Sequence, residues 1–285
     1  MEGAAGAGVA GAGNPGSGTR CAPEAAGAPP RSFIYALGRV QPRFPRLAVE
    51  KEFVQVAGRS DNAGLTDREV LHAVLSQRQN RYLARQLCYV LTVEGVETYL
   101  LHPRDPVDFD QLVEAIRPAP RATDVDVVIG LRGPMASPDM CNGLTLPIVV
   151  FDQIYSFDVD ALITSLPKPK GADAKAFTAS AEEMFARVVQ MADNAGATDE
   201  DRALNYLAVR YPAIYARTSE AFAQDAWLTG VDVRPSTLSG ARTIVDVVFS
   251  YTNRNTDFTE KFSVRSDMTE EFPFLVTKLS PYYDR

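Results

Sequence analysis

The chain has 285 residues, of which 46% are hydrophobic and 23% charged, and its formal net charge is -7. This is the composition of an ordinary globular protein, and the length suits one large or two modest domains. An acidic chain without a basic half neutralises few phosphates, so we expect no broad binding to nucleic acid or to an anionic membrane. Its longest apolar runs, such as residues 146–151, are far shorter than the roughly 18 residues that span a bilayer.

The first residues are rich in Gly and Ala and lack the basic start and aliphatic core of a secretory signal. The three cysteines, Cys21, Cys88 and Cys141, are widely spaced and form no CxxC motif. This argues against a disulfide scaffold, and we expect a cytoplasmic protein. Residues 1–31 have few large apolar side chains and are predicted to be a disordered tail. Residues 6–11 match GxGxxG, but no strand precedes them, so we do not interpret this match as a dinucleotide site.

Residues 32–166 are predicted to form a mixed helix and strand module. It begins with a short strand at 33–38 and a Pro-rich turn at 42–45, and a capping box, in which Thr66 and Glu69 each bond the other's backbone, starts a helix. The apolar face changes side after Leu75, which predicts a break at 76–80. The later elements are a hairpin turning at 94–95, a helix at 108–116, buried strands at 126–131 and 146–151, and a brief helix after Asp158.

The composition of residues 167–179, which start Pro-Lys-Pro-Lys-Gly, predicts a linker, and residues 180–285 form the second module. A capping box at Ser180 predicts a helix to Met191, and further helices start at Thr198 or Asp199 and at Pro212. The periodicity then changes to that of strands, at 244–251, 258–265 and 272–279. The fold class is therefore α+β, with helices followed by an antiparallel sheet in the second module.

Few residues suggest chemistry. His72 is interpreted as a structural side chain on a helix and His102 as a surface residue. Three acids, Asp105, Asp108 and Asp110, fit the start of a helix better than a metal site. Cys88 and Cys141, with His102, are the weaker alternative for a zinc site if they meet in the fold; otherwise we expect no cofactor and no catalytic residues.

Two groups of arginines stand out in an acidic chain. The first is Arg78, Arg81 and Arg85, whose spacing puts them on one helix face, and the second is Arg39, Arg43 and Arg46. They either pair with carboxylates elsewhere in the fold or recognise a carboxylate-bearing partner, for which the guanidinium fork is well suited. We predict peptide or anion binding at the first group, extended by the second.

Stretches of both modules resemble the C-terminal region of the cyanobactin maturation proteases PatG and PatA. They occur in the family's order, at residues 33–38, 44–58, 76–94, 126–133, 140–160, 203–214, 229–254 and 270–285. The family's upstream subtilisin-like protease domain has no counterpart here, so the resemblance implies no protease and supplies no catalytic residues. It implies a non-catalytic accessory protein in the maturation of ribosomally synthesised peptides, with a precursor peptide or maturation proteins as partners. A metal-assisted enzyme of peptide modification and a dimerising scaffold, as a homodimer, remain the alternatives.

Overall fold

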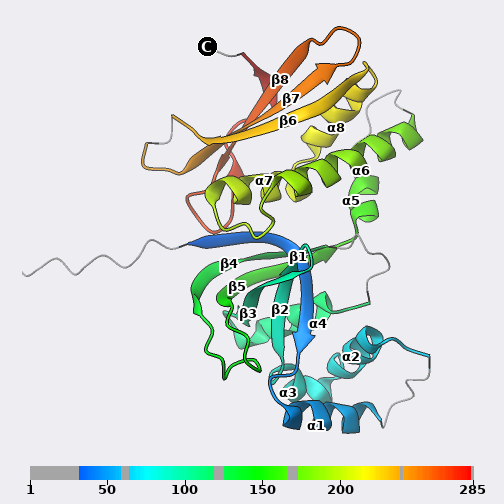
Figure 1. The fold of residues 1–285 in the computed structure, drawn as a ribbon, viewed down its shortest axis with the longest axis vertical. Helices are drawn as coiled ribbons and strands as arrows, with labels where there is room; N and C mark the ends of the chain where they lie inside the picture. The colour runs from blue at the N-terminus through cyan, green and yellow to red at the C-terminus, as the bar shows by residue number, and fades with distance from the viewer. Residues whose placement is uncertain (1–31, 59–63, 119–124, 166–172, 238–239, 284–285) are drawn as a thin grey trace, which may run out of the picture. The chain divides into compact units, whose positions relative to one another are not determined.

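The computed structural model describes residues 32–58, 64–118, 125–165, 173–237 and 240–283. The predicted tail at 1–31 and the Pro-Lys repeat of the predicted linker lie outside them. The described residues have an α+β fold in which helices precede an antiparallel sheet near the C-terminus (Figure 1), so the predicted fold class is confirmed.

The first half of the chain builds a closed five-stranded sheet in the order β1-β2-β3-β5-β4. Its strands are β1 (Phe33–Arg43), β2 (Cys88–Val93), β3 (Val96–Pro103), β4 (Val125–Met135) and β5 (Pro147–Phe157). All pairs are antiparallel except β3 with β5. The hairpin of β2 and β3 turns at Glu94 and Gly95, both with positive φ, as a tight two-residue turn requires.

Short helices connect these strands. Between β1 and β2 lie α1 (Leu47–Ala57), α2 (Asp67–Leu75), the 3-10 turn η1 (Arg78–Asn80) and α3 (Arg81–Ala84); η2 (Pro106–Asp108) and α4 (Phe109–Ala115) follow β3. The capping box of Thr66 and Glu69 starts α2, and the chain leaves the α-helix after Leu75, so both predictions are confirmed. The sequence analysis missed α1, and β1 continues through the expected turn at Pro42.

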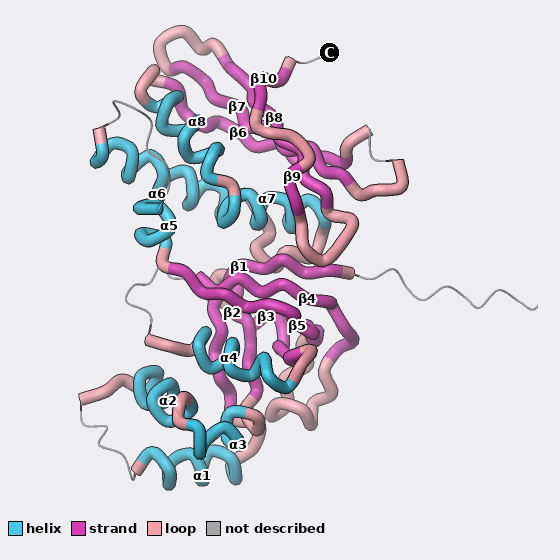
Figure 2. Tube along the Cα trace, turned by 180° about the vertical axis from the view of Figure 1, so that it is seen from behind, coloured by secondary structure: helices cyan, strands magenta, loops and turns pink. Residues whose placement is uncertain are grey.

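The second half packs helices on one face of an open sheet, as Figures 1 and 2 show. The helices on this face are α6 (Ala174–Met191), α7 (Asp199–Arg210) and α8 (Pro212–Phe222), while the short α5 (Val159–Ser165) follows β5 and contacts α6. The sheet runs β10-β8-β7-β6, with β9 also on β8, and consists of β6 (Ala226–Pro235), β7 (Ile244–Asn253), β8 (Thr259–Asp267), β9 (Phe274–Leu275) and β10 (Ser280–Tyr282). The sequence analysis did not predict β6.

The start of α6 corrects the prediction of a helix that begins at Ser180. Asp173 caps this helix by accepting a hydrogen bond from the Ala176 backbone N–H at 2.9 Å, so it begins at Ala174. Ser180 lies inside the helix, where its hydroxyl donates to the Phe177 carbonyl at 2.9 Å. Such back-bonding competes with a capping role, and the second half of the expected linker is therefore helical.

One hydrophobic core connects the two halves of the chain. Tyr35 and Leu37 of β1 are buried in the same cluster as Phe177 of α6 and Leu207 of α7. The Asn205 side chain also donates to the Tyr35 carbonyl at 2.8 Å. The predicted modules thus share a packed interface through β1, and their division into separate domains stays a prediction.

Candidate functional site

The main cavity lies where the closed sheet meets α5 and α6, and its volume is about 880 Å³. Its walls come from five separate parts of the chain: β1, β2 with its hairpin turn, the start of β4, α5 with α6, and the loop after α6. A volume of this size is typical of pockets that bind small ligands. The interface between the two halves therefore contains a candidate binding site that the sequence analysis did not predict.

The cavity has an apolar wall and a charged rim. Its apolar side chains include Leu37, Val125, Val159, Phe185 and Val189. Among the described lining residues, Arg39 carries a guanidinium, and Glu94, Asp160 and Glu182 carry carboxylates. Glu94 and Glu182 form no ion pair with another described residue, so these two carboxylates give the rim a negative potential.

Two buried polar side chains in the wall have hydrogen-bonding atoms without a partner in the described part of the chain. These atoms are the Thr92 hydroxyl oxygen and the Asn194 side-chain oxygen, on residues that are only 8% and 3% exposed. The Asn194 amide nitrogen is occupied, since it donates to the Glu94 carboxylate at 2.9 Å and to the Val189 carbonyl at 2.8 Å. Each of these two atoms has less than 1 Å² of accessible surface, so they lie behind the surface of the cavity wall.

The predicted arginine face is exposed. Arg78, Arg81 and Arg85 are all exposed, and they follow the path of η1 and α3 rather than one continuous helix. Arg81 pairs with Asp110 at 2.6 Å, but both side chains are more than half exposed, so this ion pair contributes little to stability. Within the described ranges no carboxylate forms an ion pair with Arg78 or Arg85.

A small pocket of about 80 Å³ adjoins this face. It is lined by Arg81, Arg85, Val107, Phe109 and Asp110, among others, and Val107 is strongly exposed. Guanidinium groups beside an apolar surface suit a peptide segment that carries both a carboxylate and an apolar side chain. The geometry is therefore compatible with the predicted anion or peptide binding.

The second arginine group has a different environment at each position. Arg43 forms an ion pair with Glu97 of β3 at 2.7 Å, and Arg46 is exposed immediately before α1. Arg39 lines the main cavity instead. The proposed extension of the arginine face therefore concerns Arg43 and Arg46 more directly than Arg39.

The two cysteines proposed as metal ligands do meet, but as a disulfide between Cys88 and Cys141 with their Cα atoms 6.0 Å apart. The inference against disulfides was wrong because spacing along the sequence does not reveal this contact between β2 and the loop after β4. In the disulfide neither sulfur is a thiolate, the form that binds a metal. The third proposed ligand, His102, has its Nδ1 3.0 Å from the Pro103 carbonyl oxygen. A search of the described ranges finds no group of three His, Cys, Asp or Glu side chains that could hold a metal ion.

The three aspartates considered as a metal cluster have local roles. Asp105 and Asp108 form a capping box around η2, and Asp110 pairs with Arg81. His72 lies in the last turn of α2. These positions agree with the structural interpretation of the four residues.

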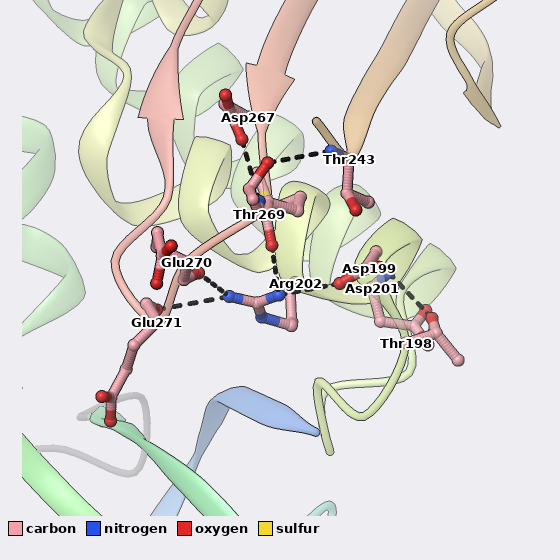
Figure 3. Close-up of polar contacts among 10 residues, drawn as sticks. Thr198, Asp199, Asp201, Arg202, Thr243, Asp267, Thr269, Glu270 and Glu271 are labelled. Carbon is pink, nitrogen blue, oxygen red and sulfur yellow. Dashed lines mark hydrogen bonds and ion pairs between the residues drawn. The ribbon is translucent and has the colours of Figure 1, made fainter. Parts of the chain in front are cut away.

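Two charged clusters, around the buried Arg202 and the exposed Arg104, join separate elements. Arg202 of α7 is 1% exposed; it donates to the Asp199 carboxylate at 2.7 Å and to the carbonyls of Met268 at 2.9 Å and Glu270 at 2.6 Å (Figure 3). Near it, Arg104 bridges two carboxylates, Asp152 at 2.5 Å and Glu271 at 3.2 Å. Burial and the adjacent Asp152 raise the pKa of Glu271 to about 7, although Arg104 opposes this shift.

A third cluster lies at the opposite part of the closed sheet. Asp126 accepts hydrogen bonds from the Val40 backbone N–H at 2.7 Å and from the Ser156 hydroxyl. Burial raises the pKa of Asp126, while these bonds and the nearby Arg68 lower it. Arg68 itself donates to the carbonyls of Val40 and Ala115, so the cluster joins α2 to β1 and β4.

Comparison with known proteins supports the resemblance seen in the sequence. Residues 171–282 match the family model described as PatG C-terminal. A solved structure described as PatG Domain of Unknown Function superposes with a TM-score of 0.73 at 20% identity, over 88% of this chain and 98% of that chain. No curated protein matches the chain. The resemblance to the PatG C-terminal region is thus confirmed, and the structural match extends the shared fold to the first half of the chain.

The described helices were also compared with the requirements of a membrane span, and none of them is both long enough and apolar enough to cross a bilayer.

Proposed function

We propose that this chain, with its PatG-type C-terminal region, is a non-catalytic accessory protein that binds a precursor peptide during the maturation of ribosomally synthesised peptides. The family match over residues 171–282 supports the biosynthetic context. The observation that carries the binding role is the exposed arginine face, Arg78, Arg81 and Arg85, beside the small pocket at Val107.

The exposure of this face supports the second interpretation of the arginines, recognition of a partner. Guanidinium groups that served the fold would be buried against carboxylates, as Arg202 is. Arg78 and Arg85 are instead exposed and form no ion pair with any carboxylate in the described ranges. Their charge is therefore available to a carboxylate on a partner.

The test uses a short fluorescent peptide of alternating Glu and Leu, with a Gln and Leu peptide of the same length as its neutral counterpart. We expect the acidic peptide to bind in the weak to moderate range and to dissociate as salt rises, because exposed ion pairs contribute only about 0.2–1 kcal/mol each and are screened. Arg81→Ala and Arg85→Ala should each weaken binding about 1.4- to 5-fold and leave the melting temperature unchanged.

Lys175→Ala is the matched control, because it removes one exposed positive charge from α6, away from the arginine face. It should leave peptide binding unchanged. Equal binding of both peptides, or equal weakening by Lys175→Ala and Arg85→Ala, would refute a site at the arginine face. The same preparations, analysed for zinc and by sedimentation, test the metal-assisted enzyme and the dimerising scaffold.

A further inference from the structure

The main cavity differs from the arginine face in charge and in shape, and it carries a separate inference. We propose that this cavity binds an apolar ligand that bears an organic cation, such as a primary ammonium group. The inference rests on the cavity's own lining and holds independently of peptide binding at the arginines.

The size and the apolar wall set the first requirement on the ligand. A volume of about 880 Å³ holds a small molecule or a few peptide residues. Leu37, Phe185 and Val189 come from β1 and α6 and give the wall an apolar surface. A ligand that fills this space removes its own apolar surface from water, which favours binding by about 25 cal/mol per Å².

The rim sets the second requirement, which is a positive charge. Among the described lining residues, Glu94 of the hairpin turn and Glu182 of α6 carry carboxylates that form no ion pair with another described residue. Opposite charges in a partly enclosed site attract more strongly than in bulk water, and like charges repel. An organic cation is therefore favoured over an anion of the same size.

Three probes with the same alkyl chain separate charge from apolar contact. Octylammonium, octanol and octanoate, each below its micellar concentration, are titrated into the full chain and followed by calorimetry. We expect affinity to fall in that order. Equal affinities, or tighter binding of octanoate, would overturn the proposal.

Variants then locate the binding in the cavity. Ala186 is an exposed residue of α6 that lines the cavity, so Ala186→Trp should occlude it and weaken octylammonium binding at least about tenfold, since the buried apolar contact is lost. Glu182→Gln should weaken octylammonium about two- to fivefold, as expected for one partly exposed ion pair, and leave octanol unchanged. Glu50→Gln removes the same charge from exposed α1, which does not line the cavity, and should leave all three affinities unchanged.

A capped tripeptide, Leu-Lys-Leu, distinguishes the source of the cation. If it binds and competes with octylammonium, the natural occupant is the lysine segment of a peptide; if only octylammonium binds, the occupant is a small amine. Binding of octylammonium that Ala186→Trp and Glu182→Gln both leave unchanged would place it outside the cavity and refute the site. Because neither variant alters the arginine face, their binding of the acidic peptide reports separately on the proposed function.

Discussion

Replacement of Arg202 by methionine tests the most buried charged group of the fold. In the folded protein its guanidinium satisfies the Met268 and Glu270 carbonyls, at 2.9 and 2.6 Å, and pairs with Asp199 at 2.7 Å. Methionine keeps an apolar stem of similar length but donates no hydrogen bond. Asp199 is 43% exposed and can rehydrate, whereas the two carbonyls lose their donor.

The expected loss follows from these two carbonyls. An unsatisfied buried acceptor costs about 1–3 kcal/mol, so the loss of two should lower the free energy of unfolding of Arg202→Met by about 2–6 kcal/mol. For a chain of this size one kcal/mol corresponds to about 2–4 °C, so the melting temperature should fall by roughly 4–24 °C. Urea denaturation monitored by circular dichroism measures the first quantity, and calorimetry the second.

Two matched variants make the result specific. Arg202→Lys keeps the charge but loses the planar guanidinium that can donate to several acceptors together. Its free energy of unfolding should lie between those of wild type and Arg202→Met. Arg85→Met makes the same change at an exposed position and should stay within about 0.5 kcal/mol of wild type. A loss below about 1 kcal/mol for Arg202→Met would refute the argument that Arg202 fastens the 268–271 segment to α7.

Three further predictions follow from other contacts. Reduction of the Cys88–Cys141 disulfide, which closes a loop with a sequence separation of 53, should expose two additional thiols to a thiol reagent and lower stability by up to about 4 kcal/mol; an unchanged thiol count contradicts the bond. Because the folded-state pKa of Glu271 is raised to about 7, its contribution to stability is complete below the unfolded pKa and is lost as pH rises through about 7. Urea titrations at about pH 5 and 8 should show this loss in wild type and not in Glu271→Gln; a parallel loss in both would exclude Glu271 as its source. Gly196→Ala should destabilise the protein strongly, since φ is +59 there and a Cβ would lie 2.0 Å from the Tyr35 carbonyl oxygen; a melting temperature equal to that of wild type would contradict this contact.

Most elements with local signals were predicted well from the sequence; the capping box expected at Ser180 is an exception, because Ser180 lies inside α6. The Thr66 capping box, the Glu94-Gly95 turn and the Thr198 cap each depend on residues within four positions of one another. Local hydrogen bonds and positive φ are properties of short sequences, and they survive packing. The structure retains all three.

Features that depend on distant contacts were missed. The Cys88–Cys141 disulfide joins residues 53 positions apart, and the main cavity is assembled from elements between Leu37 and Asn194. The edge strand β6 was also missed; it carries Gly230 in its middle and, among the described strands, pairs with β7. The disulfide and the cavity depend on distant partners, whereas β6 pairs with the next strand and has a weak apolar signal, since Leu228 is its one buried residue.

The position of the main cavity follows from the way β1 is shared. Its first half pairs with β4 and its second half with β2, with the change at Gly38 and Arg39. On the edge left by this change, the Leu37 N–H donates to the Asn194 carbonyl at 2.8 Å and the Tyr35 N–H to the Gly196 carbonyl at 3.3 Å. The loop after α6 thus completes the hydrogen bonding of β1.

The residue that completes the strand also lines the cavity. The Asn194 backbone carbonyl holds β1, its amide nitrogen holds the Glu94 turn, and its side-chain oxygen remains without a partner in the described ranges. The hydrogen bonds of the amide nitrogen to the Glu94 carboxylate and the Val189 carbonyl hold the Glu94 turn at the rim of the cavity, so less conformational freedom is lost there when a ligand binds. The contacts that join the closed sheet to the helices therefore also pre-organise the polar wall of the cavity.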